Sequence, residues 1–419
     1  MDFDYEQILA ATPERLRCAL TWQTAGAKPD GKILFGCGVA RKCGEEAAKI
    51  VRSSGGPDRR ALIVTGRNVT SIGIPDLVRA ALESSGFSVD VFSDVQPEPP
   101  AETPDRVAAM LRDRGFDVVV GLGGGSALDT ARAAAALVTN PGSITDYVPG
   151  GGRQFEKPGL PSIMIPTTSG SGSEVSPFFV FIVGGKKRSA GHPMLFADVA
   201  LIDPILTVTM PPGVTAGTGL DALTHAVEGL THIKAYPIGD ALSVKSVELV
   251  FEYLPRATAD GSDIEARYYM SWASALGMMS YSWTGGLYAH SISYVLTHHL
   301  GTGHGAGCGI ALPYTLMFNI EFIREKLEYM AGAAGLQGGL PGDCGDTALA
   351  VIRRTQDLLG EVGMPRRLKE MGVKPSDVSL YAEDLVRDYP RPFNPRPMTL
   401  RGASQLFESM WDGELRPIA

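Results

Sequence analysis

The sequence predicts an α/β N-terminal domain with a Rossmann-like parallel sheet, followed by an all-α C-terminal domain. Up to about residue 206, short runs rich in Val, Ile and Leu alternate with helical stretches, which is typical of a parallel sheet with crossover helices. Beyond Pro204 the apolar runs lengthen into helix-sized amphipathic segments. Because Pro204, Pro211 and Pro212 favour a break there, we expect domains at 1–206 and 207–419.

The individual elements follow from the same patterns. Short apolar runs predict strands in the first domain, at 61–65, 89–92, 117–121 and 162–166. Amphipathic periodicity predicts helices in the second domain, including 238–253, 264–279 and 347–360.

Composition excludes several classes of protein. A length of 419 residues allows two domains that each bury their own core. The net charge of -8 argues against a nucleic-acid partner, because such proteins carry basic surfaces. The five cysteines are an odd number without a CxxC pair, so neither a disulfide framework nor a thiolate zinc site is indicated. The N-terminus is acidic and no apolar run reaches the roughly 20 residues of a membrane span, so we expect a cytoplasmic protein without a membrane anchor.

Four residues of the second half have the pattern of a divalent-metal site. Asp221 and His225 are four residues apart, which places a carboxylate and an imidazole on one helix face. His290 and His304 would come from a later helix and a Gly-rich turn. One carboxylate and three imidazoles suit zinc, iron(II) or a similar ion. A single histidine is more often a core or surface residue, but three of the 7 histidines fall in this arrangement.

Two glycine-rich loops are candidates for binding a dinucleotide. The first follows the strand at 117–121 and contains Gly123, Gly124, Gly125 and Ser126 at the start of a helix. Glycines let a pyrophosphate approach the backbone, and the unpaired N–H groups of a helix start attract it. Ser126 could cap that helix or donate to the phosphate.

The second loop, 166–177, supplies hydroxyl groups after another strand, among them Thr167, Thr168, Ser171 and Ser176. It could contact the same dinucleotide from the other side. A tight structural turn and an ordinary polar loop are the alternative interpretations of the two loops.

These motifs together resemble the iron-containing, group III alcohol dehydrogenases. The resemblance runs over nearly the whole chain, through GGGS at 123–126 with Asp129, PTTSGSGSEVSP at 166–177, GLDALTHAVEG at 219–229, His290 and His304, and Asn394-Pro395-Arg396. It implies a dinucleotide-binding domain and a helical domain, with a metal and a nicotinamide meeting in the cleft between them, as in the architecture shared with dehydroquinate synthase. It also implies that Lys187 and Leu206 contact the cofactor, and that the protein forms a homodimer.

The resemblance implies a mechanism as well. Asp221, His225, His290 and His304 would leave one coordination position open for an alcohol or aldehyde oxygen. The ion would act as a Lewis acid while a hydride passes between the substrate carbon and the nicotinamide.

Three departures from the family pattern affect the expected site. Where many NAD-preferring members carry Asp, this chain has Gly66, followed by Arg67 and Asn68. The loss of an acid and the gain of a cation predict use of NADP(H), or of both NADP(H) and NAD(H), unless Arg67 only faces solvent. Glu98 stands where the family often has a cofactor-contacting Asn, and we exclude it from the expected site.

The third departure is Tyr294, which stands four residues after the third metal ligand where many members have His. His290, Tyr294 and His298 could share a helix face. A proton relay through Tyr294 or His298 is one interpretation, and packing is the other.

The substrate is expected to be a small alcohol or aldehyde. The basic residues Lys186, Lys187, Arg188 and His192 suggest an anionic aldehyde, such as a semialdehyde or phosphonoacetaldehyde. Two other functions stay open: a sugar-phosphate cyclase or lyase resembling dehydroquinate synthase, and a non-catalytic scaffold on the same fold. The four-ligand motif and the scarcity of basic residues argue against the first, and the intact motifs argue against the second.

Overall fold

The chain forms two compact units. The computed structural model describes residues 3–17, 19–23, 31–51, 59–336 and 346–418. The first unit comprises the described residues up to Thr168 together with Gly172–Thr209, and the second comprises Ser169–Ser171 and the described residues from Met210 onward. The sequence placed the boundary between residues 206 and 207. The short insertion Ser169–Ser171 had no signal in the sequence.

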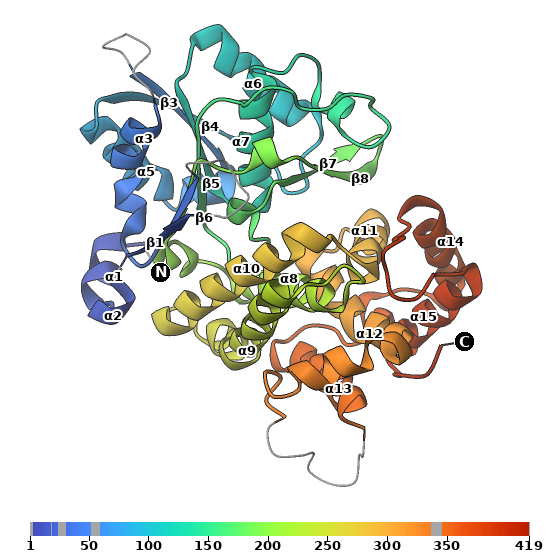
Figure 1. Ribbon diagram of the computed structural model, residues 1–419. Helices are drawn as coiled ribbons and strands as arrows, with labels where there is room; N and C mark the ends of the chain where they lie inside the picture. Colours follow the sequence, from blue (N-terminus) through green and yellow to red (C-terminus); the bar gives the residue numbers. More distant parts are fainter. Residues whose placement is uncertain (1–2, 18, 24–30, 52–58, 337–345, 419) are drawn as a thin grey trace. The chain divides into compact units, whose positions relative to one another are not determined.

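A seven-stranded sheet forms the centre of the first unit (Figure 1). Its order is β1-β2-β9-β6-β5-β3-β4, and all neighbouring pairs are parallel except β1 with β2. The strands are β1 (Leu20–Gln23), β2 (Lys32–Phe35), β3 (Arg59–Gly66), β4 (Phe87–Val95), β5 (Val118–Gly123), β6 (Ser162–Pro166) and β9 (Val199–Ile202). The four predicted strands correspond to β3, β4, β5 and β6. The parallel sheet expected from the apolar runs is therefore confirmed.

Helices cover both faces of this sheet. The pair α3 and α5 packs on one face, and the pair α6 and α7 packs on the other (Figure 1). The helices of this unit are α1 (Tyr5–Ala11), α2 (Glu14–Arg17), α3 (Cys43–Ile50), α4 (Arg67–Ser71), α5 (Ile74–Ser84), α6 (Glu102–Arg114) and α7 (Gly125–Leu137). Central strand β5 is buried along its whole length, as a strand covered on both faces must be.

A separate two-stranded hairpin, β7 (Phe178–Val183) and β8 (Lys186–Gly191), was not predicted. Its two-residue turn is Gly184-Gly185, with φ values of 58° and 76°. Both values lie in the left-handed region, which the favoured hairpin turn requires.

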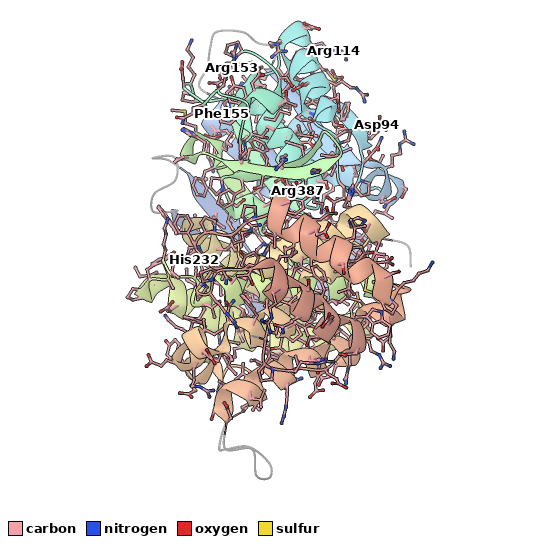
Figure 2. The ribbon with its side chains drawn as sticks, turned by 90° about the vertical axis from the view of Figure 1, so that its right-hand side faces the viewer. Asp94, Arg114, Arg153, Phe155, His232 and Arg387 are labelled. Carbon is pink, nitrogen blue, oxygen red and sulfur yellow. The ribbon has the colours of Figure 1, made fainter. Side chains whose placement is uncertain are left out.

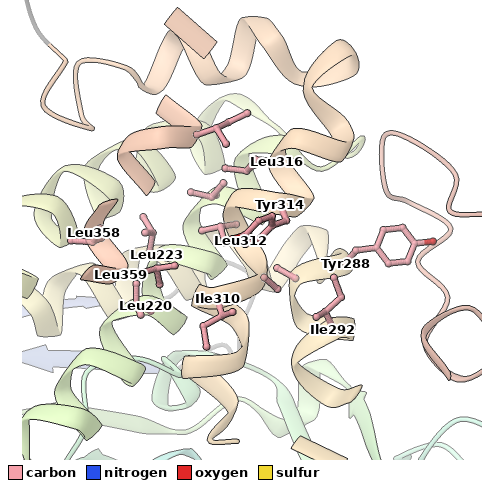
Figure 3. Packing of buried hydrophobic residues seen from close by; sticks show 14 of the residues in the cluster. Leu220, Leu223, Tyr288, Ile292, Ile310, Leu312, Tyr314, Leu316, Leu358 and Leu359 are labelled. Atoms are coloured by element: carbon pink, nitrogen blue, oxygen red, sulfur yellow. The ribbon is translucent and has the colours of Figure 1, made fainter. Parts of the chain in front are cut away.

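The second unit consists of helices, as predicted from its amphipathic segments. They are α8 (Pro212–Thr231), α9 (Pro237–Ala259), α10 (Ile264–Thr284), α11 (Tyr288–Leu300), α12 (His304–Met330), α13 (Thr347–Glu361), α14 (Val378–Asp388) and α15 (Leu400–Asp412). Figure 3 shows part of their shared apolar core, which includes Leu223 of α8, Ile292 of α11, Leu312 of α12 and Leu358 of α13. This core fixes α8, α11 and α12 beside one another.

Helix α12 is the one helix in the described ranges that is long and apolar enough to cross a membrane. Its most apolar window is 78% buried inside the protein. A core helix passes the same test of length and composition, and the burial of α12 agrees with that role.

Candidate active site

The four predicted metal ligands converge on a single carboxylate oxygen. The Nε2 atoms of His225, His290 and His304 lie 3.9, 3.9 and 3.8 Å from Oδ1 of Asp221. Donor atoms that share one ion at bond lengths of about 2.0–2.2 Å lie at roughly such separations. Helices α8, α11 and α12 therefore bring together residues that are 83 positions apart in the sequence, from 221 to 304.

Burial and unsatisfied atoms show that this cluster suits a cation. Asp221, His225 and His290 are 4%, 4% and 2% exposed. Within the described part of the chain, Oδ1 of Asp221 and Nε2 of His290 are buried without a hydrogen-bond partner. Such atoms cost free energy unless something binds them. Burial lowers the pKa of His225 to about 4, so the imidazole is neutral at pH 7 and has a lone pair to donate.

Two neighbouring groups fix the histidine tautomers. Oε2 of Glu228 lies 2.7 Å from Nδ1 of His290 and accepts a hydrogen bond from its N–H, which leaves the lone pair on Nε2. The hydroxyl of Ser293 donates to the carbonyl oxygen of His304, so it accepts a hydrogen bond from Nδ1 of the same residue at 2.9 Å. In both residues the lone pair that could bind a metal is on Nε2, the nitrogen that faces Asp221.

Close packing of α12 against α8 and α11 fixes the positions of the predicted ligands. A Cβ atom at Gly305 would lie 2.2 Å from the carbonyl oxygen of Gly217 in α8, and one at Gly307 would lie 2.8 Å from Oγ of Ser293 in α11. Only glycine allows α12 to approach both helices so closely. The first turn of α12 is thereby held against the other ligand helices.

Sequence reasoning missed Cys308, which is fully buried one turn after His304 in α12. Its Sγ belongs to a group with ligand atoms of Asp221, His290 and His304 that all lie within 4.8 Å of one another. The four-residue spacing from His304 was a signal that could have found it.

The two candidate relay residues have different surroundings. The ring of Tyr294 is buried and stacks on His304 with centroids 5.5 Å apart. The Cζ atom of Arg391 lies 6.0 Å from the centroid of the same ring. His298 is exposed, and its ring contacts His299 rather than a metal ligand within the described residues.

The first glycine-rich loop forms the start of α7, as the sequence predicts. Gly124, Gly125 and Ser126 are partly exposed there. Gly123 has φ 149°, and a Cβ atom on it would lie 2.9 Å from that of Ala127. Thr168 lies next to Gly124, so the two loops meet at this helix start.

The remaining predicted residues of the second loop, and Leu206 further along the chain, are assigned to the two units as follows. Thr167 is buried and its N–H donates to the carbonyl oxygen of Gly123 at 2.9 Å. Ser176 is 2% exposed, Leu206 is fully buried, and Ser171 belongs to the second unit.

Both carboxylate oxygens of Asp129 accept hydrogen bonds from residues of the first unit. Its Oδ1 accepts from Oγ of Ser173 at 2.6 Å, and its Oδ2 accepts from the N–H of Val180 at 3.0 Å. Burial raises the pKa of Asp129 to about 6, although Arg132 opposes the shift. The carboxylate therefore ties α7 to the loop and the hairpin.

Two cationic residues of the expected cofactor site have acidic partners. Nζ of Lys187 is buried and lies 2.8 Å from Oε2 of Glu98, a residue with φ 52°. Arg67 is 83% exposed and pairs with Asp94 at 2.6 Å; Asp94 is labelled in Figure 2. Gly66 ends β3 and Asn68 is exposed in α4.

Two family models match this chain, and both describe iron-containing alcohol dehydrogenases. Residues 30–204 match the family described as iron-containing alcohol dehydrogenase, and residues 215–411 match the C-terminal part of the Fe-containing alcohol dehydrogenase family. Long-chain-alcohol dehydrogenase 1 of Geobacillus thermodenitrificans is 37% identical over 330 residues, which are 78% of this chain and 83% of that protein.

Solved structures of similar proteins have the same fold over most of this chain. A 1,3-propanediol oxidoreductase has a TM-score of 0.83 and 28% identity, covering 90% of this chain and 97% of that one. The sulfoacetaldehyde reductase from Bifidobacterium kashiwanohense in complex with NAD+ has a TM-score of 0.80 and 29% identity, covering 90% and 96% of the two chains.

Proposed function

Because the chain belongs to the iron-containing alcohol dehydrogenase family, we propose that it moves a hydride between NAD(P)(H) and a small alcohol or aldehyde. The observation that carries the proposal is the convergence of three Nε2 atoms on Oδ1 of Asp221. A divalent ion bound there would supply Lewis-acid polarisation of the substrate oxygen. The family name indicates iron(II), and zinc(II) accepts the same donors.

Each side chain of the site would have its own role in the reaction. Asp221, His225 and His290 would hold the ion where water is excluded, since each is almost completely buried. His304 is 27% exposed at its side chain, so the substrate would enter on its side. Tyr294 stacks on His304, and its hydroxyl would pass the proton that leaves or joins the substrate oxygen. The partly exposed N–H groups at Gly124 to Ser126 would hold the pyrophosphate.

Both NADP(H) and NAD(H) would serve as cofactor. Gly66 offers no carboxylate to repel a 2′-phosphate, and the exposed Arg67 offers a cation. Asp94 competes for that cation through the 2.6 Å pair. This balance supports dual use more than strict preference for NADPH.

An anionic substrate is supported by Arg391 more than by the basic hairpin. Lys187 already pairs with Glu98. Arg391 lies beside Tyr294, and its Nε donates to Oγ of Ser291 at 2.7 Å. Burial alone would lower the pKa of Arg391, but Tyr281, Tyr294 and Glu228 raise it, so the guanidinium stays charged. That charge, which Glu228 offsets in part, would attract a carboxylate or sulfonate on the aldehyde. Sulfoacetaldehyde, on which the reductase from B. kashiwanohense is named to act, carries such a group.

The protein would work as a cytoplasmic homodimer. Among the described residues, the buried cysteines Cys37, Cys43 and Cys308 are not joined in disulfides, which suits a reducing compartment. The dimer rests on the family resemblance alone, and light scattering coupled to gel filtration would test it.

One experiment tests the whole proposal. The protein is stripped of metal and restored with Fe(II) or Zn(II), and neutral and anionic aldehydes are then assayed with NADH and NADPH. We expect net oxidation of the reduced cofactor only after metal is restored. Full turnover without metal would overturn the metal role. Turnover without net consumption of NAD(P)H would indicate the cyclase chemistry instead, and no turnover would favour a scaffold.

A further inference from the structure

Helix α12 presents a second possible metal donor beside His304. Cys308 follows His304 by four residues, the same spacing that places Asp221 and His225 on one face of α8. Sγ of Cys308 lies 3.8 Å from Nε2 of His304. The thiol is fully buried.

The thiol lies beside the unsatisfied ligand atoms. Sγ and the ligand atoms of Asp221, His290 and His304 all lie within 4.8 Å of one another. Oδ1 of Asp221 and Nε2 of His290 are buried without hydrogen-bond partners in the described part of the chain. Metal bonds of about 2.3 Å to sulfur and 2.0–2.1 Å to nitrogen would span the 3.8 Å between Sγ and Nε2 of His304, and the more distant donors would move toward the ion.

The backbone around Cys308 fixes its direction. A Cβ atom at Gly307 would lie 2.8 Å from Oγ of Ser293, and one at Gly309 would lie 2.7 Å from Cβ of Leu220. These contacts hold both neighbours of Cys308 against α11 and α8. The backbone at Cys308, and with it the direction of its Cα–Cβ bond, is therefore fixed relative to α8 and α11.

We propose that Cys308 is a metal ligand of the resting site, in the position that the aspartate and three histidines leave open. This inference rests on the metal centre of the proposed function. A thiolate is a soft donor that favours zinc over harder ions, so Cys308 would shift the preference of the site toward zinc. An ion at this site would thereby differ in its donor set from one held by nitrogen and oxygen alone.

Cobalt(II) tests the bond directly, because a thiolate ligand gives it a sulfur-to-metal charge-transfer band in the near ultraviolet. The full-length protein is stripped of metal and loaded with one equivalent of cobalt(II), as checked by metal analysis. We expect the band in the wild-type protein and in Cys37→Ser, which alters another buried free cysteine in the first unit. We expect it to be absent in Cys308→Ser and Cys308→Ala at equal cobalt content.

Two results would overturn the inference: a fully loaded wild-type protein without the band, or a band that persists in Cys308→Ser. Circular dichroism confirms that the variants fold. Metal competition gives a second readout, since the ratio of bound zinc to bound iron should fall severalfold in Cys308→Ser. An unchanged ratio would contradict the shift in preference. Turnover of aldehyde with NAD(P)H is measured separately, so a wild-type protein that is active but lacks the band would refute Cys308 as a ligand and leave the proposed function intact.

Discussion

Glu228 and His290 form a buried carboxylate–imidazole pair, with Oε2 of Glu228 2.7 Å from Nδ1 of His290. The same carboxylate accepts hydrogen bonds from the N–H groups of Leu287 at 2.6 Å and Ala289 at 2.8 Å. Burial alone would raise the pKa of Glu228, but His290, the hydrogen bond from Leu287 and the charge of Arg391 lower it below its usual value. The ionised carboxylate therefore holds both the start of α11 and the ring of His290.

Glu228→Gln should weaken metal binding. The amide keeps the size of the side chain, but its oxygen is a weaker acceptor for the imidazole proton and its NH2 group cannot accept the backbone bonds. Loss of such a partner behind a ligand histidine typically costs about 10- to 100-fold in metal affinity. Competition with a chromogenic chelator measures the change for Zn(II).

Asp384→Asn is the matched control for that variant. Asp384 lies 2.7 Å from Nε2 of His299, also in α11, but His299 is not one of the converging ligands. We expect it to leave metal affinity unchanged. Equal affinities for wild-type protein and Glu228→Gln would show that the pair with His290 is only structural.

Asp221 and His225 could be proposed as a pair of ligands because a spacing of four residues on a helix is visible in the sequence, whereas His290 and His304 lie in separate segments that only the motif order links to them. Cys308 has that spacing from His304, but a cysteine without a CxxC partner gives no zinc signature by itself. Glu228 was missed for a different reason, since its partner lies 62 positions later and only the packing of α8 and α11 brings the two together.

The sequence likewise predicted part of the fold and missed part of it. Apolar runs identified the central strands because a buried parallel strand is apolar on both faces. The hairpin β7–β8 was missed although Gly184-Gly185 lies between two extended runs, and such a pair is a hairpin signal. The short segment Ser169–Ser171 follows the second unit because of contacts such as Oγ of Ser169 with Oγ of Ser271, and no local pattern encodes that.

Tyr294→Phe should lower kcat severalfold with little change in KM. The variant keeps the ring that stacks on His304 and removes only the hydroxyl that would pass the proton. Steady-state kinetics with a saturating aldehyde measures the effect. Tyr381→Phe is the control, because Tyr381 stacks on His299 instead, with centroids 4.6 Å apart. If kcat were the same for wild-type protein and Tyr294→Phe, the relay role would be refuted.

Arg67 and Asp94 should have opposite effects on cofactor preference. Asp94→Asn frees the guanidinium and should raise the ratio of kcat/KM with NADPH to that with NADH. Arg67→Gln should lower the same ratio. We expect changes of about two- to fivefold, because Arg67 is 83% exposed and exposed charge pairs contribute little. Arg79→Gln, in the exposed pair with Asp76, is the control. Shifts in the same direction for both test variants would contradict the proposal.

Arg391→Gln should raise KM for anionic aldehydes and spare neutral ones. A charge-assisted hydrogen bond contributes about 1.5–3 kcal/mol, which corresponds to at least about a tenfold change. The comparison uses succinate semialdehyde and sulfoacetaldehyde against butanal. Arg391→Lys should recover part of the effect, since it restores the charge without the planar group. Equal losses on butanal would show that Arg391 only supports the fold through Ser291.

Glu174 predicts a pH dependence of stability in the first unit. Burial raises its pKa from 4.5 to about 7, so the folded state favours the protonated form. The stability this provides is complete below pH 4.5 and is lost as pH rises to about 7. Glu174→Gln removes this loss, so its free energy of unfolding relative to wild type should rise over that range by up to about 3 kcal/mol. Urea denaturation of metal-free protein between pH 4.5 and 8 measures the difference. Glu45→Gln, at an exposed position, should show a much smaller dependence. A difference for Glu174→Gln that stays constant with pH would mean that the carboxylate is ionised in the folded protein throughout.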